Sequence, residues 1–221
     1  QRVGEIWHYA GDYLEGDEWD SFKNYHFYRT VLDLVANETL TASGFLENLN
    51  FMRGNLHCNL QGYAWNMIDS HDTGRFLNSA GLHAKKQRLA AALQLLLPGM
   101  PMIYYGDEVS LEGGPDPDCR RGMPWDPDRQ NRETLLYYRT LIGVRHSYPA
   151  MTKGEATWQE ADDELGIILI NRLYSNRNFL LVFHTKPGRV WLTDLKGMRN
   201  LITGKVFSGR LESFEAAVLI E

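Results

Sequence analysis

Two short acidic segments of this chain contain the residue types needed to cleave a glycosidic bond. One is GEIWH at residues 4–8, which contains Glu5, and the other is SHDTGR at residues 70–75, which contains Asp72. Glycoside cleavage needs carboxylates in unlike environments, because one must be protonated to release the leaving group while others stay ionised to stabilise a cationic transition state. The two segments therefore predict an acid at Glu5 and an ionised stabiliser at Asp72.

Glu5 lies in a short run, residues 2–6, that resembles a buried strand ending at a loop. In a parallel barrel, catalytic residues stand at such strand ends. Trp7 and His8 can remove water from the carboxyl group and so raise its pKa, as a general acid at neutral pH requires. The alternative is a surface glutamate with no catalytic role.

His71 and Asp72 can both hydrogen-bond to adjacent sugar hydroxyls. Alternatively, Asp72 is a helix N-cap and His71 an ordinary loop residue. Asp116 and Arg120 lie in a loop rich in proline and glycine, residues 113–128, and can bind distal sugar rings through charge-assisted hydrogen bonds. A local ion pair in a solvated loop explains these two residues equally well.

The composition limits the function classes. With 43% hydrophobic residues among 221, the chain can bury a core, and its net charge of −5 argues against binding nucleic acid through phosphate neutralisation. No apolar run approaches the roughly 18 residues needed to cross a bilayer, and no signal peptide is visible. The histidines lack metal-ligand spacing and no glycine-rich phosphate loop is present, so the sequence indicates no metal or nucleotide cofactor.

The two cysteines, Cys58 and Cys119, do not form a CxxC pair. They predict either two free thiols, which fits a reducing compartment, or one disulfide. The first residue is Gln1 rather than methionine, so we expect that a preceding segment is missing.

The order of predicted elements changes near residue 150. Three short apolar segments that end in polar loops are predicted as strands: residues 2–6, 63–68 and 101–105. Four segments with helical spacing are predicted as helices: residues 28–35, 41–49, 81–97 and 132–145. Beyond residue 151, four short β-branched or apolar runs are separated by turn residues: 167–171, 179–184, 189–193 and 216–220. These patterns predict a parallel α/β unit followed by an all-β sandwich.

In their order and spacing, these segments resemble the α-amylase family of glycoside hydrolases. The segments at 4–8 and 70–75, together with PGMPMIYYGDE at 98–108, are similar to that family's motifs. GGPDPDCRR at 113–121 resembles the neopullulanase, cyclomaltodextrinase and maltogenic amylase branch. The resemblance spans essentially the whole chain. Taken together, the motifs are highly specific.

The resemblance implies a fold and a set of residue roles. The fold is α/β, the second half of a (β/α)8 TIM barrel at residues 1–149, followed by an all-β C-terminal sandwich at residues 150–221. Glu5 matches the general acid/base and Asp72 the transition-state-stabilising aspartate of a retaining mechanism. The resemblance also implies substrate contacts for His71, Asp116 and Arg120. Trp7 is a further candidate for binding the substrate.

Several family features are absent from this sequence. The nucleophilic aspartate lies in a GxRxDxA-like motif on the preceding strand, and neither the motif nor the first half of the barrel is found here. The chain is therefore expected to be inactive alone, to pair with the missing N-terminal half, and to expose unpaired edge strands that favour a homo-oligomer. Any calcium ion would belong to the missing half. Tyr9, His26 and Gly74 also differ from the residues usual in this branch.

The leading hypothesis is that the parent protein hydrolyses α-glucosidic bonds in cyclomaltodextrins, pullulan or maltooligosaccharides. The rival is a non-catalytic amylase-like protein that binds sugar or a partner. An unrelated barrel lyase or isomerase would need a lysine or metal set that the sequence does not show. The branch and the sparse cysteines predict a cytoplasmic location.

Overall fold

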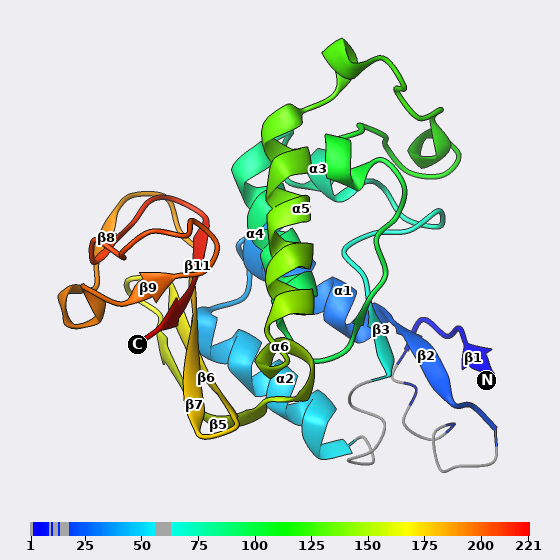
Figure 1. The fold of residues 1–221 in the computed structure, drawn as a ribbon. Coiled ribbons are helices and arrows are strands. Elements are labelled where there is room, and N and C mark those ends of the chain that lie inside the picture. The colour runs from blue at the N-terminus through cyan, green and yellow to red at the C-terminus, as the bar shows by residue number, and fades with distance from the viewer. Residues whose placement is uncertain (1, 9, 11–12, 14–17, 56–62) are drawn as a thin grey trace.

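Four short parallel strands form the sheet at the N-terminal end of the chain (Figure 1). The computed structural model describes residues 2–8, 10, 13, 18–55 and 63–221, so Tyr9 and Cys58 lie outside the described residues. The strands pair in the order in which they occur: β1 (Val3–Gly4), β2 (Ser21–Asn24), β3 (Ala64–Asn66) and β4 (Met100–Pro101). Each neighbouring pair is parallel, so the carboxyl ends of the strands lie along one edge.

Helices connect and cover these strands. Their bounds are α1 (Tyr25–Val31), a π-helical continuation (Leu32–Ala36), α2 (Ala42–Asn55), α3 (Phe76–Ser79), α4 (Ala84–Leu96), α5 (Arg132–Ser147) and α6 (Ala150–Lys153). Short 3₁₀ turns lie at Asp107–Val109, Asp118–Arg120, Pro127–Arg129 and Thr193–Leu195. Within the part that the structure describes, no helix is long and apolar enough to cross a membrane.

Three buried amides tie the parallel strands to α4. Asn24 donates from Nδ2 to Oδ1 of Asn66 at 3.0 Å, and Asn66 donates to the Pro98 carbonyl at 2.8 Å. Gln94 on α4 donates to the carbonyls of Asn66 and Met102 at 3.1 and 2.8 Å. Because buried polar groups are stable only when hydrogen-bonded, these bonds fix where the strands end.

The predicted strand at residues 101–105 is wrong in its extent. Sheet pairing covers only β4, and one further hydrogen bond joins the Met102 amide to the Asn66 carbonyl at 2.8 Å. Tyr104 and Tyr105 instead place their rings against the guanidinium group of Arg75. An apolar run cannot distinguish a strand from a segment whose aromatic rings pack elsewhere.

The second part of the chain is antiparallel. A five-stranded sheet has the order β5-β6-β7-β11-β9, and a two-stranded sheet pairs β10 with β8. The bounds are β5 (Glu155–Asp162), β6 (Ile167–Tyr174), β7 (Arg177–His184), β8 (Val190–Trp191), β9 (Arg199–Asn200), β10 (Arg210–Leu211) and β11 (Glu215–Ile220). Strand β5 was not predicted, because it is an edge strand with no buried residue and lacks an apolar run.

Alternating residues of the larger sheet face two different cores. Ile168 and Leu181 pack with the helices α1 to α5, whereas Leu180 and Val182 pack against the two-stranded sheet. This period of two is the pattern expected for strands buried on both faces. The observed order, parallel α/β followed by antiparallel β, agrees with the prediction. The domain boundary at residues 149 and 150 stays a prediction.

Arg145 on α5 caps the C-terminal end of α4. Its guanidinium donates to the carbonyls of Leu95 at 2.6 Å and Leu97 at 3.4 Å, and also to that of Gly99. We expect Arg145→Lys to lower the free energy of unfolding by about 1–3 kcal/mol, because an ammonium group cannot reproduce this fork. Urea denaturation would measure the change. Arg139→Lys, at an exposed position of the same helix, is the matched control; equal losses in the two variants would contradict the capping role.

Candidate active site

Glu5 stands directly after β1, at the carboxyl edge of the parallel sheet. The preceding Gly4 is covered by the Trp19 indole, and a Cβ atom on Gly4 would lie 2.0 Å from that ring. Only glycine therefore allows the strand to end with Trp19 packed on it. The Glu5 side chain is 39% exposed, so the carboxylate is accessible from solvent.

Two donors hold the same oxygen of Glu5. Lys23 on β2 donates from Nζ to Oε1 at 2.7 Å, and Tyr25 at the start of α1 donates its hydroxyl to Oε1 at 2.8 Å. The parallel register, in which Gly4 pairs with Phe22, brings these residues beside Glu5. Burial and the neighbouring Glu5 raise the pKa of Tyr25, so its hydroxyl remains a donor.

The prediction that the pKa of Glu5 is raised is wrong for this chain. Burial by itself raises that pKa, but the hydrogen bonds from Lys23 and Tyr25 and the charge of Lys23 outweigh burial, and the pKa lies below its ordinary value. Trp7 does not enclose the carboxylate, since its indole stacks on the Tyr25 ring at 4.5 Å and remains 47% exposed.

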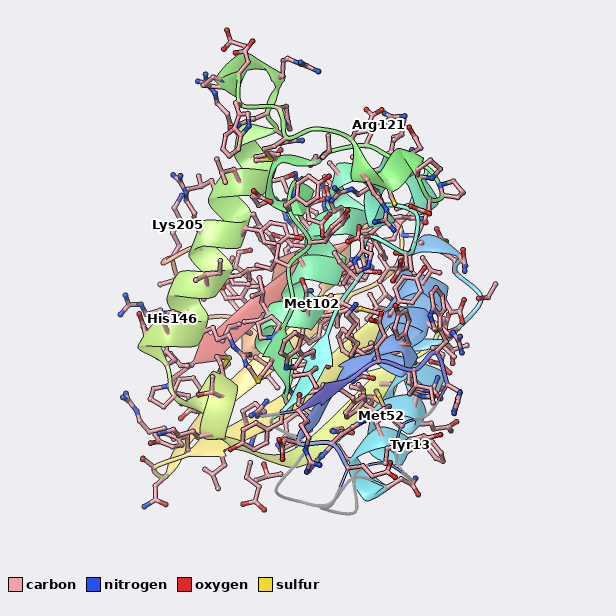
Figure 2. All side chains as sticks on the ribbon, turned by 90° about the vertical axis from the view of Figure 1, so that its right-hand side faces the viewer. Tyr13, Met52, Met102, Arg121, His146 and Lys205 are labelled. Carbon is pink, nitrogen blue, oxygen red and sulfur yellow. The ribbon has the colours of Figure 1, made fainter. Side chains whose placement is uncertain are left out.

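The other four predicted side chains are joined in one series of contacts: His71, Asp72, Arg120 and Asp116. His71 Nε2 lies 3.1 Å from Asp72 Oδ2, and Arg120 Nη2 lies 3.4 Å from Asp72 Oδ1. Arg120 also binds Asp116, with Nε 2.6 Å from Oδ1. The local ion pair in the loop is thus present, and the same arginine reaches the predicted catalytic aspartate. Figure 2 shows the neighbouring Arg121 on this loop, at the opposite end of the view from Tyr13 and Met52.

The alternative interpretation of Asp72 as a helix N-cap is wrong. The residue that accepts a hydrogen bond from the first amide of α3 is Asp69, whose Oδ2 lies 2.7 Å from the Phe76 nitrogen. Asp72 is left with His71 and Arg120 as its side-chain partners. The charge of His71 also lowers the pKa of Glu5, and the charge of Asp72 raises the pKa of Tyr25. The His71–Asp72 pair therefore lies within electrostatic range of the Glu5–Tyr25 pair.

Arg75 is a structural residue of this region that the sequence did not reveal. Its side chain is fully buried and donates to the Cys119 carbonyl at 2.9 Å, to the Tyr105 carbonyl at 2.5 Å and to Asp107 Oδ1 at 3.1 Å. Its guanidinium also lies 3.9 Å from the centre of the Tyr104 ring. Arg75 thereby connects the loop after β3 with the loop after β4 and with the Asp116–Arg120 region. An arginine in a polar loop carries no sequence pattern that predicts burial.

Two buried carboxyl groups accompany Arg75. Burial raises the pKa of Asp107 well above its usual range, and the adjacent Asp69 raises it further, because one guanidinium cannot balance two buried carboxylates. Burial also raises the pKa of Asp69. Cys119, the neighbour of Arg120, is a buried free thiol that donates to the His71 carbonyl at 3.2 Å.

We expect Asp107→Asn to reduce the pH dependence of stability. Burial raises the folded-state pKa of Asp107, so the protonated side chain stabilises the folded state. This stabilisation is fully present below a pH of about 3.9, the usual pKa of aspartate, and is lost as the pH rises through the folded-state pKa. Asparagine stays neutral and its carbonyl still accepts from Arg75. Urea unfolding across a series of pH values should therefore show a smaller fall in stability for the variant than for the unmodified chain.

The control for that measurement is Asp128→Asn, whose side chain is 88% exposed. This variant should reproduce the pH slope of the unmodified chain. Equal slopes for Asp107→Asn and the unmodified chain would show that Asp107 holds no extra proton in the folded state.

The geometry can be compared with known proteins. Among the described residues, no group of three or more histidine, cysteine or acidic side chains is arranged to hold a metal ion. The family model of the alpha-amylase catalytic domain matches residues 2–133. The chain belongs to the alpha-amylase family.

Curated relatives of this alpha-amylase family chain carry related names. A cyclomaltodextrinase from Geobacillus thermopakistaniensis is 33% identical over 216 residues, covering 96% of this chain and 37% of the relative. Neopullulanase 2 from Thermoactinomyces vulgaris is 37% identical over 209 residues, covering 88% of this chain and 36% of the relative. An intracellular maltogenic amylase from Bacillus subtilis is 34% identical over 191 residues, covering 85% of this chain and 32% of the relative. The chain thus spans about a third of the length of these relatives.

Solved structures agree with the family assignment. A cyclomaltodextrinase structure superposes with a TM-score of 0.90 at 27% identity, covering 98% of this chain and 40% of the other. The structural neighbours are TIM-barrel enzymes of the α-amylase family.

Four residues of the site were not predicted from the sequence: Lys23, Asp69, Arg75 and Asp107. The hydrogen bond from Tyr25 to Glu5 also has no counterpart among the sequence predictions.

Proposed function

We propose that the complete protein hydrolyses α-glucosidic bonds in cyclomaltodextrins, pullulan or maltooligosaccharides by a retaining mechanism. In this proposal, residues 1–149 form the second half of its catalytic TIM barrel and residues 150–221 form its C-terminal β-sandwich. The observation that carries the proposal is the placement of Glu5, His71 and Asp72 at one carboxyl edge of a parallel sheet. The cyclomaltodextrinase and neopullulanase relatives, which match most of this chain, support the choice of substrates.

Each site residue has a role in the proposed reaction. Glu5 protonates the glycosidic oxygen as the bond breaks, and its carboxylate then activates the water that hydrolyses the glycosyl-enzyme intermediate. Asp72 stabilises the positive charge of the transition state. The exposed face of Trp7 and the polar groups of His71, Asp116 and Arg120 contact the glucan chain.

The nucleophile of this reaction comes from another part of the complete protein. No GxRxDxA-like segment occurs in the 221 residues, and the chain spans only 37% of its cyclomaltodextrinase relative. In retaining enzymes the nucleophile and the acid/base lie about 5–5.5 Å apart. A second carboxylate at that distance would raise the pKa of Glu5 and so oppose the effect of Lys23.

The missing half has two sheet edges on which to pair. Among the described residues, β1 and β4 each have one strand neighbour, and their side chains Val3 and Met100 are 41% and 40% exposed. Parallel strands added at both edges would complete the hydrogen bonding of the sheet and cover these side chains. The same edges would favour a homo-oligomer when the missing half is absent. A cytoplasmic location is supported by the intracellular maltogenic amylase relative.

A reconstitution experiment tests the proposed function. Hydrolysis of β-cyclodextrin, pullulan and maltotriose would be measured for this chain alone, for a separately produced N-terminal half, and for the two mixed. Activity in the mixture alone would support the proposal. Sugar binding without hydrolysis, in a mixture whose halves co-sediment, would instead favour the non-catalytic amylase-like protein.

A further inference from the structure

The two oxygens of the Glu5 carboxylate have different surroundings. Oε1 accepts both hydrogen bonds, one from Lys23 and one from Tyr25. Among the described residues, no donor reaches Oε2. A carboxylate free in water has two equivalent oxygens, so the difference is imposed by the side chains of β2 and α1.

We propose that Lys23 is a positioning residue that holds Glu5 by Oε1 and leaves Oε2 as the oxygen that exchanges a proton with the glycosidic bond. This inference rests on the proposed acid/base role of Glu5. The proton moves from Oε2 to the glycosidic oxygen as the carbon–oxygen bond breaks, and Glu5 is left as the carboxylate.

The chemistry of the two donors supports this assignment. An ammonium group has three donors and no acceptor, so an oxygen in contact with Lys23 cannot also present a proton toward it. Tyr25 is a buried side chain and its hydroxyl points to the same oxygen. When Glu5 is protonated, the proton is therefore favoured on Oε2.

Lys23 is placed to hold Glu5, whereas a surface lysine would extend into solvent. Its side chain is only 15% exposed and lies on β2 between the buried Phe22 and Asn24. Because side chains alternate along a strand, Lys23 points away from the face on which Phe22 packs. A lysine held in this way loses little further entropy when it binds Glu5.

Other charged and titratable groups also act on Glu5. Tyr25 on α1 hydrogen-bonds to it, and His71, in the loop after β3, lowers its pKa by charge. His71 is itself 3.1 Å from Asp72, whose negative charge offsets a protonated imidazole. Among the described residues, Lys23 is the cation that directly contacts Glu5, and removing it should raise the pKa of that carboxyl group.

Replacement of Lys23 by methionine tests the inference, with Lys23→Arg as the control that keeps the charge. Carbon-13 NMR of the Glu5 carboxyl in the 221-residue chain would follow its titration. We expect Lys23→Met to raise the midpoint by about one pH unit, and Lys23→Arg to leave it near that of the unmodified chain. An unchanged midpoint in Lys23→Met would overturn the inference.

The reconstituted enzyme provides the second measurement. The high-pH limb of kcat/KM reports loss of the proton from the free enzyme's general acid, so it should move to higher pH in Lys23→Met and not in Lys23→Arg. A shifted NMR midpoint with an unshifted limb would overturn the part of the inference that concerns catalysis. If no mixture hydrolyses any substrate, the proposed function fails, while the NMR titration still decides whether Lys23 holds Glu5.

Discussion

Replacing Glu5 by glutamine is expected to lower the kcat of the reconstituted enzyme by about 10²–10⁴-fold, the range contributed by a positioned general acid/base. The amide carbonyl of glutamine can still accept from Lys23 and Tyr25, so the side chain should keep its place. The amide cannot supply a proton to the leaving oxygen. Steady-state hydrolysis of maltotriose by the two mixed halves measures the effect.

Two controls separate the loss of the acid from a general disturbance. Glu155→Gln changes an exposed glutamate of β5 and should leave kcat unchanged. The first turnover of α-maltosyl fluoride, followed as a burst of released fluoride, should be much less impaired in Glu5→Gln than the first turnover of maltotriose, because fluoride leaves with little help from an acid. If the first turnovers of both substrates were slowed equally, or if kcat on maltotriose fell less than tenfold, Glu5 would not be the general acid.

The second large effect is expected at Arg75. Arg75→Met should lower the free energy of unfolding by about 3–5 kcal/mol, because it leaves buried acid groups without their cation. The carbonyls of Cys119 and Tyr105 would lose their hydrogen-bond donor as well. Methionine has a similar length, so the change removes charge and donors more than volume. Urea denaturation at neutral pH measures the loss.

The partner variant makes the origin of this loss testable. In an Asp107→Asn background, one acid is neutral, so Arg75→Met should cost less than it does alone. Arg132→Met, at a side chain that is 73% exposed, should leave the denaturation midpoint unchanged. If Arg75→Met cost the same in both backgrounds, the loss would come from the carbonyl hydrogen bonds and not from the uncompensated acid.

The site residues differ in how far they could be recognised from the sequence. Glu5, His71 and Asp72 follow short apolar runs, and such local patterns indicate strands that end in functional loops. Their catalytic and binding roles stay predictions until activity is measured. Lys23 had no such signal, because a lysine beside a phenylalanine in a short segment is common on protein surfaces.

The elements of the fold show the same limit. The helices at α4 and α5 were expected, since their apolar spacing extends over several turns and ends at turn or capping residues. Strand β5 was missed, because an exposed edge strand needs no apolar run. The tyrosines after β4 were assigned to a strand, although their rings pack on an arginine that is about 30 residues away in sequence.

By itself, the sequence determined the order of α/β and all-β segments and the identity of the acidic residues at the strand ends, because both depend on neighbours within a few positions. Only the tertiary structure decided the pKa direction of Glu5, since Lys23 becomes its partner through the parallel pairing of β1 with β2. It also decided the burial of Arg75 between loops that are far apart in the chain. A local pattern records local contacts, whereas the charge state of a carboxyl group depends on whichever groups packing brings beside it.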